Sequence, residues 1–137
     1  MSFEQCIKER RARKVMPNKA RAASLMESSN QAIATAKTIK LQQSSLKSIF
    51  RELYEGLREY CEAIGYLQGY KFMDHESYTH FLRDELREDS IAKKFDRYRK
   101  LRNGINYYGD DVDVETVKEA LINIPKMIND LKKPKNI

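Results

Sequence analysis

An apolar stripe that runs from Leu46 to Leu67 constrains the fold more than any other feature of the sequence. Its members recur three or four residues apart, which matches the turn of an α-helix. They are Leu46, Ile49, Phe50, Leu53, Leu57, Tyr60, Cys61, Ile64 and Leu67. A stripe of this length predicts a long helix with one buried face, and such a face needs other helices to cover it.

The other segments also show helical periodicity. Five expected helices cover residues 17–41, 46–67, 75–86, 90–108 and 114–131, and residues 2–14 form a further short helix or an ordered arm. Pro125 is expected to kink the last helix. No segment shows a convincing strand pattern, and five glycines and three prolines are too few for a sandwich or barrel. The sequence therefore predicts an all-α antiparallel bundle of five to six helices.

The 137 residues predict a single domain. Within it we distinguish a basic N-terminal arm or short helix at 1–16, the helical bundle at 17–132 and a frayed tail at 133–137. The net charge is +6, and residues 1–21 hold seven lysines and arginines against two glutamates. Such a segment either binds phosphate backbones or an acidic partner, or is only solvated, and the sequence leaves these alternatives open.

Several classes of site and location are disfavoured. No apolar run approaches the roughly 20 residues of a membrane span, and the polar N-terminus predicts no signal peptide. Cys6 and Cys61 fit neither a disulfide framework nor a metal site, which suits the cytoplasm. His75 and His80 are five residues apart and diverge around a helix, so no metal and no cofactor are expected. We expect His75 to be exposed, whereas His80 could reach a cleft.

Arg102 projects into the apolar face of the helix expected through Phe95–Tyr108. A guanidinium is rarely buried without a partner, so we expect either a carboxylate from another helix or an anion in a cleft. Phosphate suits such a cleft, because its oxygens match the guanidinium fork. The candidate phosphate- or RNA-binding residues are Arg99, Arg102, Asn103 and Asn106, and the candidate catalytic residues are Arg102 and Tyr107. A phenol is a poor general base at neutral pH.

Two segments resemble the HEPN family of helical domains associated with nucleic acids. The first is Arg99-Lys100-Leu101-Arg102-Asn103 followed by Asn106-Tyr107-Tyr108-Gly109, which is similar to the family's Arg-polar-spacer-His motif. The His position falls at Tyr107, or at Tyr108 or Gly109 with longer spacing, so this copy departs from the pattern. The second, Lys14-Val15-Met16-Pro17-Asn18-Lys19, resembles the start of small prokaryotic HEPN proteins encoded beside minimal nucleotidyltransferases.

The resemblance implies a HEPN-like bundle that forms a homodimer along its motif helices. In active members the Arg and His cleave RNA without a metal, whereas inactive members bind nucleotides or serve as partner subunits. We therefore expect binding of RNA or nucleotide at Arg102, with weak or degenerate ribonuclease activity at most. The protein would be the toxin-like or accessory half of a nucleotidyltransferase toxin–antitoxin pair. The alternative is a helical adaptor or structural dimer without ligand, in which Arg102 pairs with a carboxylate.

Overall fold

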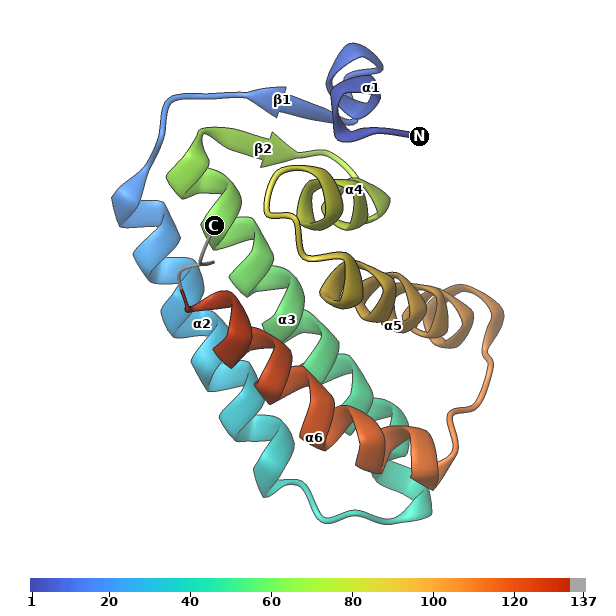
Figure 1. Cartoon of the computed structure of the whole chain (residues 1–137). Helices are drawn as coiled ribbons and strands as arrows, with labels where there is room; N and C mark the ends of the chain where they lie inside the picture. The colour runs from blue at the N-terminus through green and yellow to red at the C-terminus, as the bar shows by residue number, and fades with distance from the viewer. Residues whose placement is uncertain (134–137) are drawn as a thin grey trace.

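The computed structural model describes residues 1–133 and confirms the all-α prediction (Figure 1). Six α-helices, one 3₁₀ turn and two short strands make up this part of the chain. They are α1 (Phe3–Lys8), β1 (Ala12–Lys14), α2 (Lys19–Thr38), η1 (Gln43–Ser45), α3 (Leu46–Gln68), β2 (Tyr70–Phe72), α4 (Glu76–Asp84), α5 (Asp89–Tyr108) and α6 (Val114–Leu131). Apart from Lys133, the expected frayed tail lies outside the described residues.

Helix α3 carries the predicted stripe and forms the axis of the bundle. Figure 1 shows α2 and α6 running side by side with it. Contact with α2 is close at Gly56, where an added Cβ would lie 2.8 Å from the Ile33 side chain. The Ser29 hydroxyl donates a 2.6 Å hydrogen bond to the Gly56 carbonyl at the same point. The absent side chain at position 56 therefore allows the two backbones to approach.

The prediction that the chain has no strand is wrong. Strands β1 and β2 pair in antiparallel register, with Ala12 opposite Phe72, Arg13 opposite Lys71 and Lys14 opposite Tyr70. Three residues per strand are too few to show a period of two, and β1 is mostly cationic. The basic N-terminal segment thus consists of a short helix and a strand. Both contribute to the main core, in which Phe3, Cys6 and Ala12 are buried.

Helices α4 and α5 pack on the side of α3 away from α2 (Figure 1). Helix α5 ends at Tyr108 and is followed by Gly109, whose φ of 68° is in the left-handed region that favours glycine. The side chain of Asp113 then caps α6 by accepting a 2.8 Å hydrogen bond from the Thr116 amide. Helix α6 is continuous through Pro125. This arrangement places the C-terminal half of α5 beside the connection between β2 and α4.

Candidate functional site

Arg102 lies half-buried on α5, with its guanidinium between two tyrosine rings. Its Cζ is 5.7 Å from the ring centroid of Tyr54 on α3 and 5.6 Å from that of Tyr107. It donates hydrogen bonds of 3.2 Å to the Asn103 side-chain oxygen and 3.4 Å to the Tyr107 hydroxyl. Within residues 1–133 it forms no ion pair. An arginine with a purely structural role in the core would need an ion pair with a carboxylate, and Arg102 has none among these residues.

An open cleft of about 390 Å³ extends from this guanidinium. Its walls come from α5, from the β2–α4 connection with the first residue of α4, and from the residue before β1. The lining residues are Arg11, Met73, Asp74, His75, Glu76, Arg99, Arg102, Asn103 and Tyr107. Segments far apart in the sequence therefore meet here, and one of them belongs to the basic N-terminal segment.

The carboxylates around the cleft are engaged by other arginines. Arg11 bridges Asp74 at 2.7 Å and Glu76 at 3.3 Å. Arg99 pairs with Asp96 at 2.7 Å. Of the three arginines that line the cleft, Arg102 is thus the one that forms no ion pair with a carboxylate among the described residues. Its charge remains available to an incoming anion.

His75 also lines this cleft, although the sequence analysis did not place it among the candidate site residues. We expected it to be exposed, but it is half-buried and its ring stacks on Tyr54 at a centroid distance of 5.8 Å. Its Nδ1 lies 2.9 Å from the Tyr54 hydroxyl, with the donor set by the tautomer. Burial, together with the guanidinium groups of Arg102 and Arg58, lowers the pKa of His75 to about 4. The imidazole is therefore neutral at pH 7.

The structure brings together four of the five candidate residues, namely Arg99, Arg102, Asn103 and Tyr107. Asn106 points elsewhere and accepts a 2.8 Å hydrogen bond from Nε of Arg51 on α3. Tyr107 is 67% exposed even though Arg102 lies near its ring, so much of its surface is accessible to a ligand. Arg102 and its neighbours on α5 thus form one wall of a cleft whose opposite wall is the β2–α4 connection.

His80 does not reach this cleft. It is buried on α4, where its Nε2 lies 3.5 Å from a Glu76 carboxylate oxygen. It is not among the residues that line the Arg102 cleft. In residues 1–133 no cluster of His, Cys, Asp or Glu side chains could hold a metal ion.

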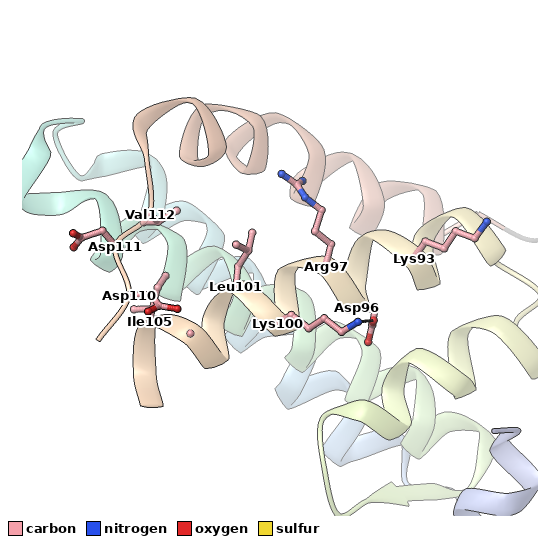
Figure 2. A pocket seen from close by; sticks show the side chains of 10 residues that line it. Lys93, Asp96, Arg97, Lys100, Leu101, Ile105, Asp110, Asp111 and Val112 are labelled. Carbon is pink, nitrogen blue, oxygen red and sulfur yellow. Dashed lines mark ion pairs between the residues drawn. The ribbon is translucent and has the colours of Figure 1, made fainter. Parts of the chain in front are cut away.

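A second cavity, of about 500 Å³, lies between α5 and the segment that follows Gly109 (Figure 2). It is also lined by basic residues, but two of them are paired. Arg97 bonds Glu119 at 2.8 Å, and Lys100 lies 3.0 Å from Asp96. An anion would have to compete with these carboxylates, so the Arg102 cleft is the better candidate for an anion site.

No protein-family profile, curated protein or solved structure matches the chain at a significant level. Among the described residues, none of the helices combines the length and apolar character that crossing a membrane requires.

Proposed function

We propose that this protein binds RNA or a nucleotide through the phosphate contact of Arg102, as a HEPN-like homodimer in the cytoplasm. One observation carries the proposal: a half-buried guanidinium opens into a cleft and forms no ion pair in residues 1–133. Desolvating a charge without a fixed counterion is unfavourable, so such a site favours an anionic ligand. Phosphate matches the planar fork of donors better than a monovalent ion does.

The neighbours of Arg102 favour a nucleic-acid phosphate over a simple anion. The exposed ring of Tyr107 offers a surface on which a base can stack. The side chain of Asn103 already orients Arg102 and has amide donors of its own. Phosphate, sugar and base contacts can therefore come from adjacent residues of one helix.

We further propose that any ribonuclease activity is weak. A general base works best when its pKa lies near the working pH. Tyr107 stands where the HEPN motif has an imidazole, and a phenol does not meet this condition. His75 supplies a neutral imidazole in the same cleft, but a pKa of about 4 makes it a weak base and leaves no proton for acid catalysis at pH 7. Binding is thus the main activity, and it fits an accessory or toxin-like half of a nucleotidyltransferase pair.

A second candidate function is a helical adaptor whose dimer serves only assembly. Its support is the end of α5, where Tyr107 and Tyr108 are 67% and 80% exposed. Exposed aromatic side chains are enriched in protein interfaces. The two candidates differ in whether the cleft takes a phosphate ligand.

The deciding experiment measures binding of a fluorescein-labelled single-stranded RNA by anisotropy, for wild type, Arg102→Gln and Lys94→Gln. Lys94 is an exposed cation on the same helix, outside the cleft and the second cavity, and so controls for net charge. Loss of one charge-assisted phosphate contact should weaken binding by about 1–3 kcal/mol, or roughly 5- to 150-fold. The control should stay close to wild type. If wild type binds no RNA and no nucleotide, the adaptor function replaces this proposal.

A further inference from the structure

The two-stranded sheet carries two cations directly opposite each other. Arg13 on β1 pairs in register with Lys71 on β2. Side chains at directly opposed positions share one face of the sheet, with Cβ atoms about 4.5–5.5 Å apart, and like charges there are destabilising. Neither side chain forms an ion pair or hydrogen bond within residues 1–133. The fold itself therefore gains nothing from this pairing of charges.

The alternation of side chains along the strands places this pair on the solvent side. The adjacent pair, Ala12 and Phe72, is buried in the core. Successive residues point to opposite faces, so Arg13 and Lys71 face away from the core. Arg13 is exposed, and Lys71 is half-buried.

This charged face leads directly into the Arg102 cleft. The register continues to Arg11 and Met73, where the Met73 amide donates a 2.9 Å hydrogen bond to the Arg11 carbonyl. These two residues lie two positions from Lys71 and Arg13 and so belong to the same face. Both also line the cleft. One further step along the sheet, about 6.6 Å at 3.3 Å per residue, leads to the Arg13–Lys71 pair.

We infer that the solvent face of the β1–β2 sheet extends the binding site of Arg102 and holds backbone phosphates of a single-stranded RNA. The inference rests on the proposed function, and it narrows the ligand from a free nucleotide to an oligonucleotide. A phosphate between Arg13 and Lys71 turns their mutual repulsion into two attractions. Arg11 is bound to two carboxylates, so it shapes the passage between the two parts of the site rather than binding the strand.

The test compares two probes, AMP and an unstructured oligouridine of about 12 nucleotides, a length within the usual range of single-strand sites. Three variants are compared with wild type. The sheet variant combines Arg13→Gln with Lys71→Gln, the matched pair combines Lys94→Gln with Lys126→Gln, and the third variant is Arg102→Gln. Lys94 and Lys126 are exposed helical cations away from the sheet and the cleft. Thermal unfolding of each variant is followed by circular dichroism. The sheet variant should be at least as stable as wild type, because a repulsion has been removed.

We expect the sheet variant to bind the oligouridine about tenfold more weakly at low salt, and to reduce the slope of log K against log salt by about 1.4, or 0.7 for each lost contact. Its affinity for AMP should not change, whereas Arg102→Gln should weaken binding of both probes. If the sheet variant binds the oligouridine as tightly as the matched pair does, the charges of Arg13 and Lys71 serve only to keep other strands from pairing with the sheet. The inference is then overturned, while the proposed function stands. If Arg102→Gln alters neither affinity, or wild type binds neither probe, the proposed function fails and the inference fails with it.

Discussion

The hydroxyl of Tyr54 lies 2.9 Å from Nδ1 of His75 and joins the centre of α3 to the wall of the cleft. Tyr54 is 1% exposed, so its position is fixed by the core. The same ring lies under the guanidinium of Arg102. One buried tyrosine therefore positions both the imidazole and the cation of the candidate site.

The depressed pKa of His75 predicts a specific pH dependence of stability. The unfolded state takes up the proton near the ordinary value of about 6.5, whereas the folded state does so only near 4. The stabilisation is therefore fully present above pH 6.5 and is lost as the pH falls towards 4. Because the ring is partly solvated, we expect a contribution of about 1–2 kcal/mol.

Urea unfolding at pH 7 and pH 4.5 measures this effect, with His75→Asn as the comparison. The variant should show a smaller difference in the free energy of unfolding between the two pH values, since asparagine does not titrate. Equal differences for wild type and variant would mean that His75 titrates normally in the folded protein.

Replacing Tyr107 by histidine should strengthen cleavage of RNA. An imidazole titrates where a phenol does not, and here it would stand next to Arg102. We expect the rate for a labelled single-stranded RNA to rise by about tenfold or more, without added metal. The gain should vanish when Arg102→Gln is combined with it. Robust cleavage by wild type that Tyr107→Phe leaves unchanged would assign the chemistry to another residue, and His75→Asn would then be the next variant.

We predict a homodimer whose interface includes α5. Tyr108, at the end of this helix, is 80% exposed, and a buried interface tyrosine often contributes about 2 kcal/mol or more. Because both copies lose the side chain, Tyr108→Ser should raise the dissociation constant by at least roughly 30-fold. Light scattering at tens of micromolar, a rough range for moderate affinities, measures the mass. Ile122→Ser, which removes an exposed apolar side chain from α6, is the control. Wild type that remains monomeric throughout this range would argue against the interface.

The N-terminal segment should be needed for stability, since it is part of the core. Phe3 is 1% exposed and packs on Tyr70 and Phe81 at centroid distances of 5.1 and 5.4 Å. Phe3→Ala should lower the free energy of unfolding by about 3–5 kcal/mol. Met16→Ala, at an 84% exposed position, should change it by no more than about 0.5 kcal/mol. A small effect at Phe3 would mean that α1 is loosely attached. Deletion of residues 1–14 therefore tests folding, and only charge substitutions test their role in binding.

Helices α3 and α6 could be predicted because each carries a long apolar stripe, as α3 does from Leu46 onwards. The position of Arg102 on an otherwise apolar face also followed from periodicity. The strands could not be predicted, because β1 and β2 owe their conformation to each other across more than fifty residues. Local preference in three-residue segments is weak compared with such a tertiary contact.

The composition of the cleft was only partly predictable for the same reason. Arg99, Arg102, Asn103 and Tyr107 lie within one helix, so their spacing already placed them near one another. His75 comes from the residue just before α4, and only the packing of this connection against α5 brings it to Arg102. An isolated histidine beside a short helix carries no signal of such a neighbour. Arg11 was counted only as a charge in a basic segment, although it forms part of the wall.

The bridge from Arg11 to Asp74 spans 63 residues and has a consequence for the order of folding. Contacts between distant residues cost more chain entropy to close and tend to form after local ones. Helices α2 and α3 are neighbours in sequence and can pair early, whereas β1 has no partner until residues 70–72 have been synthesised. During translation β1 and Phe3 therefore lack their packing partners until about half of the chain has been synthesised. The cleft also needs α5, which carries Arg102 and Tyr107, so its walls come together only after residue 107 has been synthesised.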